Sequence, residues 1–200
     1  MLSTNSIDIR SRLRNVTQPL HSELNNHPIL SKLLTPELEL EDYIKLIRLF
    51  FTFYETWESG IDRFMNNHSL DFDYTARRKT DWLKQDMKYF KQVPIDPIPE
   101  NTTNQCEINS IGQLIGSLYV IEGSTLGGQL ISRQLFQNKQ LSYDSGARFF
   151  YGYGEMTDGR WREFLSFCNC ISDIESECLR AEETAKIRFA ELIGTIKRTF

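Results

Sequence analysis

The sequence predicts an all-α protein in which residues 1–200 form a single helical bundle domain. Apolar residues recur at helical spacing along most of the chain, whereas few stretches alternate between polar and apolar residues. No Asn-Gly or Gly-Gly hairpin turn joins two strand-like runs. A chain of 200 residues is close to the size of one domain and can bury a substantial core.

The first three predicted helices are set apart by prolines. An apolar stripe at helical spacing predicts a helix over 9–24, and Pro28 follows it as a break. A second helix, over 36–57, begins with acidic residues and carries a long aromatic stripe that we expect in the core. The third, over 74–91, should end at the segment 93–99, which contains three prolines.

The second half of the chain contains three further helix-period patterns. One runs over 108–136, and the last two span about 157–176 and 179–198. No repeat or low-complexity tract interrupts them. Helix bundles place their chemistry between facing helices, so inward polar groups are the candidates for a functional site.

Composition and charge exclude several functional classes. Lys and Arg number 23 against 27 Asp and Glu, a net charge of −4, which disfavours a nucleic-acid binder. Hydrophobic residues make up 40% of the chain, yet no run approaches a membrane span and no apolar signal core begins it. Four cysteines without C-x-x-C spacing are typical of reduced thiols. We therefore expect a cytoplasmic protein without membrane attachment.

The first predicted helix carries a polar stripe beside its apolar one. Arg10, Arg14, Thr17 and His21 follow one another at steps of four, three and four residues. At 1.5 Å per residue, Arg14 and His21 lie roughly 10 Å apart along the helix axis. A histidine and arginines at this separation suit a planar ligand that bears a metal and carboxylates, of which heme is an example. Solvated side chains on a helix flank are the simpler alternative.

The helix predicted over 108–136 is unusually rich in glycine. Gly112, Gly116, Gly123 and Gly127 fall on one helical face, with Gly128 beside them. Five glycines inside a helix cost on the order of 5 kcal/mol relative to alanine, so close approach to the bare backbone must compensate. Either a tightly packed helix or a flat ligand could provide this approach. No Walker or G-x-G-x-x-G motif accompanies these glycines, which disfavours phosphate binding.

Four segments of the chain together resemble one protein family. The run LYVIEGSTLGGQLI at 118–131 is similar to the distal-helix signature of heme oxygenases, particularly the bacterial biliverdin-forming type associated with bacteriophytochromes. Thr17-x-x-x-His21 lies where the family keeps its proximal histidine. The segments FFYGYG at 149–154 and RWRxF at 160–164 follow in the family's order, so the resemblance covers most of the chain.

The resemblance assigns roles to particular residues. It implies that His21 is the proximal ligand of the heme iron and that Gly123 and Gly127 line the oxygen site. Ser124 and Gly128 belong to the same predicted catalytic segment. The positions predicted to bind heme are His21, Arg14, Arg162, Tyr119, Leu30 and Thr17, with the two arginines as propionate contacts.

Several positions depart from the pattern of mammalian members of that family. Ser124 stands where they carry the distal carboxylate that organises water, and Ser166 where they carry a third basic contact. Asn25 stands where a carboxylate often bonds the proximal imidazole. A neutral partner should transfer less electron density to the iron than a carboxylate would.

The resemblance also implies a reaction. Heme b would be both cofactor and substrate, opened with O2 and electrons from an external donor to biliverdin, CO and ferrous iron. The implied donor is a ferredoxin, a flavodoxin or a reductase, and a bacteriophytochrome is a possible recipient of the biliverdin. A protein of the same fold that binds heme or a bilin without degrading it remains the alternative. A di-iron carboxylate site is disfavoured because no histidine has a glutamate three residues before it.

Overall fold

The computed structural model describes residues 8–91 and 106–200, and all regular structure within these ranges is helical. Its α-helices and 3-10 turns are α1 (Ile9–Asn25), α2 (Pro28–Lys32), α3 (Leu40–Asn67), η1 (Thr75–Arg77), α4 (Lys79–Tyr89), α5 (Ile111–Lys139), α6 (Arg148–Tyr151), η2 (Gly154–Met156), α7 (Thr157–Cys168), η3 (Asn169–Ile171) and α8 (Glu175–Thr199). The predicted all-α class is confirmed. The proline segment 93–99 lies outside the described residues.

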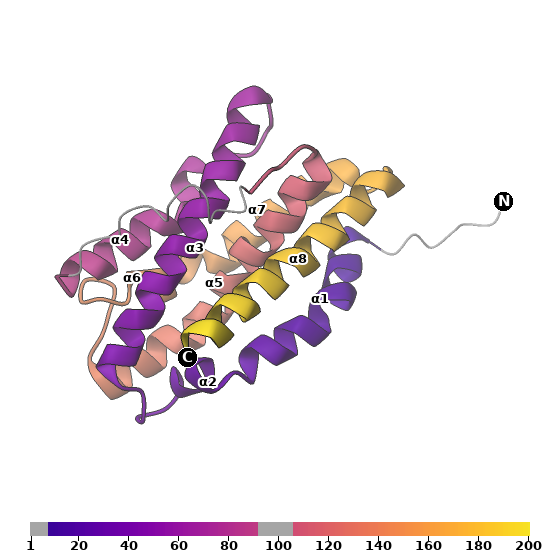
Figure 1. Cartoon of the computed structure of the whole chain (residues 1–200). Helices are drawn as coiled ribbons and strands as arrows, with labels where there is room; N and C mark the ends of the chain where they lie inside the picture. Colours follow the sequence, from indigo (N-terminus) through magenta and orange to yellow (C-terminus); the bar gives the residue numbers. More distant parts are fainter. Residues whose placement is uncertain (1–7, 92–105) are drawn as a thin grey trace.

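The helix α8 packs against both helices that carry the predicted site residues, α1 and α5. At one end of α1, Arg12 pairs with Glu175 at 2.6 Å and also with Glu182, and at the other end Lys197 pairs with Glu23 at 2.7 Å. The helix α1 therefore runs along α8 in the same direction, as Figure 1 shows. The helix α5 packs on α8 as well, so α8 carries both elements that the sequence nominates for function.

The aromatic stripe of α3 contributes a large part of the core. Tyr43, Phe50, Tyr54 and Trp57 are all buried, which confirms the interpretation of this stripe as core. Asp86 of α4 accepts hydrogen bonds from the first two backbone N–H groups of α6, at 2.7 and 2.9 Å. It therefore caps the N-terminus of α6, a helix that the sequence did not predict.

Several predicted boundaries were wrong. The second predicted helix begins at Leu40, because turns occupy 33–37 and the chain then buries Leu38, and it continues to Asn67, ten residues past its predicted end. The third is divided into η1 and α4. The helix predicted over 157–176 ends at Cys168, where η3 turns the chain to bury Ile171.

Further differences concern α5, which spans Ile111–Lys139 instead of 108–136, the start of α8, and the shortest helices. The helix α8 starts at Glu175 instead of residue 179, because acidic residues in a first turn are stabilised by the helix dipole. The short helices α2 and α6 were missed, since four or five residues carry no readable period. Within the described ranges, no helix is both long and apolar enough to cross a membrane.

Candidate active site

The glycines of α5 fall into two groups with different surroundings. A β-carbon on Gly112 would overlap the backbone carbonyl of Glu177, and one on Gly116 would overlap that of Ala181, both on α8. A β-carbon on Gly128 would lie 2.8 Å from the carbonyl oxygen of Phe150. These three glycines are therefore needed for close contact between helices, which is the first of the two explanations that the sequence allowed.

Gly123 and Gly127 face open space instead. A β-carbon on Gly127 would have no neighbour within 4 Å, and one on Gly123 would only reach the Trp161 ring at 4.0 Å. Leu126 and Leu130, at the same turns of α5, are 39% and 49% exposed. This strip of bare backbone flanked by leucines is a surface to which a flat apolar ligand can come close.

His21 presents an accessible imidazole on α1. Its ring is exposed and meets the buried Phe189 of α8 edge-on, with ring centroids 6.0 Å apart. Its Nδ1 lies 3.1 Å from the side-chain amide of Asn25, one turn further along the helix. Because amide oxygen and nitrogen are interchangeable by rotation, Asn25 can accept from Nδ1–H and leave the Nε2 lone pair for a metal.

The polar residues predicted around this strip come from three helices. Thr17 is buried and donates to the Leu13 carbonyl at 2.7 Å, and its side chain also contacts Tyr119 of α5. Burial raises the pKa of the Tyr119 phenol, while Thr17 and the positive charge of Arg14 act to lower it. Tyr119 in turn lies 5.9 Å from the ring of Trp161 on α7. The structure therefore brings Arg14, Thr17 and Tyr119 together.

Arg162 and Leu30 lie on other elements. Arg162 is exposed on α7, next to Trp161, so its guanidinium is accessible to an anionic group. Leu30 is half-buried on α2 and packs against the hydrophobic core. Neither is bonded to His21 in the structure, and their roles toward a ligand stay predictions.

Ser124 follows Gly123 and has a defined hydrogen-bonding state. Its hydroxyl donates to the Ile121 carbonyl at 2.7 Å and accepts from the Tyr54 hydroxyl at 3.2 Å. Since its only hydrogen is engaged, the exposed Ser124 Oγ can offer a further ligand or water only an acceptor lone pair. Burial raises the pKa of Tyr54, which keeps this phenol a hydrogen-bond donor. Tyr54 belongs to the aromatic stripe that the sequence predicted as core, and the sequence indicated no polar role for it.

Comparison with known proteins agrees with this geometry. The family model described as heme oxygenase matches residues 7–197. The chain belongs to the heme oxygenase family. It is thus a heme-degrading oxidoreductase, and the resemblance to the heme oxygenase family that four sequence segments indicated is confirmed. Comparison with curated protein sequences gives no significant match.

Solved heme oxygenase structures share the fold. The enzyme from Neisseria meningitidis superposes with a TM-score of 0.77 at 22% identity, over 96% of this chain and 92% of that one. The enzyme from Leptospira interrogans gives 0.76 at 17% identity, over 96% and 100%. Heme oxygenase-1 from Synechocystis, solved in complex with heme, gives 0.76 at 18% identity, over 96% and 92%.

The residues of this heme oxygenase fit the group that the family binds. A β-carbon at Gly127 would occupy otherwise free space against α5, while His21 offers a metal ligand with an orienting partner. Arg14 and Arg162 supply exposed cations for carboxylates, and Leu126 and Leu130 supply apolar surface. Heme requires these three kinds of contact: an imidazole for the iron, guanidinium groups for the propionates and apolar surface for the macrocycle.

A buried charged cluster lies directly behind the glycine strip, and the sequence analysis missed it. Glu122 accepts from Lys79 Nζ at 2.7 Å and from Arg77 Nη1 at 2.9 Å, and the Tyr153 hydroxyl lies 3.0 Å away. Burial lowers the pKa of Lys79, and Glu122 opposes this shift. The available signal was a glutamate within the otherwise apolar run 118–131.

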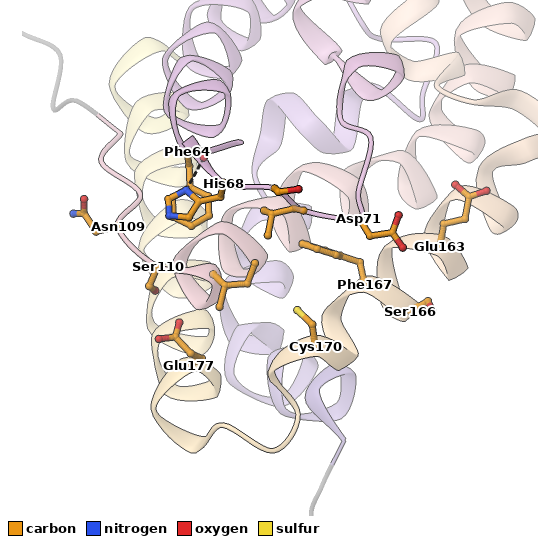
Figure 2. Close-up of a pocket in the computed structure, with 13 residues that line it drawn as sticks. Phe64, His68, Asp71, Asn109, Ser110, Glu163, Ser166, Phe167, Cys170 and Glu177 are labelled. Atoms are coloured by element: carbon orange, nitrogen blue, oxygen red, sulfur yellow. Dashed lines mark hydrogen bonds between the residues drawn. The ribbon is translucent and has the colours of Figure 1, made fainter. Parts of the chain in front are cut away.

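A separate cavity of about 900 Å³ opens at the end of the bundle where α5 and α8 begin. Figure 2 shows its wall, in which His68 stacks on Phe64 and its Nδ1 lies 2.8 Å from the Phe64 carbonyl oxygen. Glu163, Cys170 and Glu177 also contribute to it. None of the residues predicted to bind heme lines this cavity, so it is distinct from the glycine strip.

Proposed function

We propose that this heme oxygenase binds heme b between α1 and the open glycine strip of α5, and opens it with O2 and electrons from an external donor. The observation that carries the proposal is the free space at Gly123 and Gly127 on a helix whose other glycines are packed. An imidazole with an accessible Nε2 stands on the neighbouring helix, at His21. The products would be biliverdin, CO and ferrous iron.

The residues would divide the work of binding and orientation. His21 would hold the iron, with Asn25 fixing the plane and tautomer of the imidazole. Arg14 and Arg162 would bind the propionates, with Tyr119 and Thr17 beside Arg14. Bound heme supplies both the iron centre at which O2 is reduced and the carbon that is oxidised.

On the distal side the proposed roles are steric and polar. Gly123 and Gly127 would let the macrocycle approach the backbone, so that the remaining space extends along its plane toward one edge. Ser124 would accept a hydrogen bond from an ordered water and direct the second hydrogen of that water into this space. Gly128 would support the strip indirectly, by fixing α5 against α6, and Leu30 would contribute apolar surface.

We further propose a cytoplasmic protein with a small redox partner. The resemblance of residues 118–131 to phytochrome-associated members supports a ferredoxin, flavodoxin or reductase as the electron donor and a bacteriophytochrome as the acceptor of biliverdin.

The test is an optical titration followed by turnover. Hemin is added to the purified protein, the Soret band is recorded, and ascorbate is then added in air. We expect a Soret band that decays into the broad red absorption of a bilin, and His21→Ala should lose both the wild-type band and the decay unless imidazole is supplied. A Soret band that is only reduced would favour the non-degrading heme or bilin carrier, and the absence of a Soret shift would contradict heme binding.

A further inference from the structure

Arg77 is a buried arginine that joins α5, which carries the glycine strip, to α7, which borders the strip. Its side chain is 3% exposed and projects from η1 between α5 and α7. Nη1 donates to Glu122 of α5 at 2.9 Å and to the Arg160 carbonyl of α7 at 3.2 Å, while Nη2 donates to Glu163 of α7 at 2.6 Å. A single planar group thus fixes the distance between α5 and α7.

The guanidinium of Arg77 bonds α5 and α7 through its two terminal nitrogens, and it also contacts the Tyr153 side chain. The Nε of Arg77 is buried and has no hydrogen-bond partner. A buried donor without a partner is unfavourable in free energy, so this orientation does not satisfy every donor of the guanidinium. We attribute the orientation to the bridge between α5 and α7. The guanidinium also stacks over Phe72, 4.6 Å from the ring centroid, which holds its plane.

The α5 end of the bridge is itself rigid. Glu122 is 1% exposed and is also bonded by Lys79 and Tyr153. Buried ion pairs contribute little net stability compared with apolar packing, so their use here is better explained by the geometry that they impose. Glu122 directly precedes Gly123, which means that the cluster fixes the backbone where the open strip begins.

The α7 end of the bridge carries the side chains that border the strip. Arg160 and Glu163 flank Trp161 and Arg162 in one turn of α7. Trp161 would touch a β-carbon at Gly123 and lies against Tyr119, so α7 forms a side wall of the site. Any movement of α7 along α5 would shift the Arg162 cation relative to the two open glycines.

We infer that Arg77 is a specificity-determining positioning residue. It does not touch heme, and this inference rests on the proposed heme site. By fixing α7 on α5, Arg77 sets where Arg162 can hold a propionate and therefore how the macrocycle is rotated in its plane above Gly123 and Gly127. That rotation decides which meso carbon lies in the open space, and hence which biliverdin isomer is formed.

The test compares Arg77→Lys with the matched control Arg78→Lys. Lysine keeps the charge but has one ammonium group, which cannot bridge Glu122, Arg160 and Glu163 in the same plane. Arg78 is the next residue, is 33% exposed and bonds Asp62 at 2.6 Å, away from the bridge. The readouts are the isomer ratio of the biliverdin by chromatography and the heme methyl resonances of the ferric complex by proton NMR, which report in-plane orientation without turnover.

We expect the wild-type main isomer to fall at least twofold relative to the others in Arg77→Lys, with a second set of methyl resonances. Arg78→Lys should match the wild type in both measurements. Glu163→Gln serves as a second variant that is safe for folding, because Glu163 is 56% exposed, and it should shift the ratio in the same direction by less.

An unchanged isomer ratio and unchanged resonances in folded Arg77→Lys would overturn the inference. Should Arg77→Lys fail to fold, the same result in Glu163→Gln would overturn it. A wild-type protein that binds no heme would instead refute the proposed function, so the two failures are distinguishable.

Discussion

One face of α5 carries Gly112, Gly116, Gly123 and Gly127, and the two halves of this face use glycine for opposite purposes. In the first half, Gly112 and Gly116 are pressed against backbone carbonyls of α8, and any side chain there would collide with the neighbouring helix. In the second half, Gly123 and Gly127 face space that a side chain could occupy. The first pair is needed to fold the bundle, whereas the second pair has no packing partner that would explain its cost in helix stability.

This difference separates glycines that the fold needs from glycines that a ligand would need. Glycine within a helix is unfavourable by about 1 kcal/mol relative to alanine. Close helix packing compensates this cost at Gly116, and nothing within 4 Å compensates it at Gly127. A bound ligand that approaches the backbone would provide the missing compensation, and this is the physical basis of the proposed heme site.

The largest effect is expected in the packed half of α5. Gly116→Ala would place a methyl group against the Ala181 carbonyl, and α5 and α8 would have to separate. We expect a loss of about 2 kcal/mol or more in the free energy of unfolding, despite the higher helix propensity of alanine. Urea unfolding of the apoprotein measures it, and a stability equal to that of the wild type would show that the contact with α8 is not tight.

A smaller effect on stability but a large one on turnover is expected in the open half. Gly127→Leu fills free space, so the apoprotein should fold normally and still bind hemin through His21. The bulky side chain would obstruct the distal side, and biliverdin formation should fall by at least tenfold. Ascorbate-driven turnover measures this fall, with Gly159→Leu as a control, because that glycine of α7 also has nothing within 4 Å of a β-carbon. Turnover of Gly127→Leu at the wild-type rate would contradict the distal role.

The smallest effect concerns the proximal side. Asn25→Asp would replace a neutral partner of the imidazole by a carboxylate, which pulls harder on Nδ1–H and makes the imidazole a stronger donor to the iron. We expect the Fe–His stretching frequency of the ferrous protein to rise in resonance Raman spectra. Identical frequencies in the two proteins would show that Asn25 does not tune the iron.

The sequence predicted the helices better than it predicted what they enclose. Periodicity located α1, α3 and α5 because long helices repeat their apolar stripe several times. Periodicity could not tell which glycines are packed against a helix and which are open, because Gly112, Gly116, Gly123 and Gly127 share one face of an ideal helix. Their separation depends on where α8 packs along α5, and this is a property of the tertiary structure.

The polar parts of the site show the same limit. His21, Arg14 and Thr17 could be found from the sequence because they lie on one short stretch of helix. The Tyr54–Ser124 hydrogen bond joins residues 70 positions apart, and Arg77 and Glu122 are 45 positions apart. Such pairs leave no local pattern, so only the folded structure reveals them.

The most direct test is the unfolding free energy of Gly127→Ala, measured with and without hemin beside the wild type. We expect the Gly127→Ala apoprotein to gain about 0.5–1 kcal/mol, because alanine favours the helix and meets no neighbour. We also expect the additional stability conferred by hemin to be smaller than in the wild type, because the methyl group intrudes on the site. A Gly127→Ala apoprotein that is destabilised as much as Gly116→Ala, with an unchanged contribution from hemin, would contradict the division of α5 into a packed and an open half.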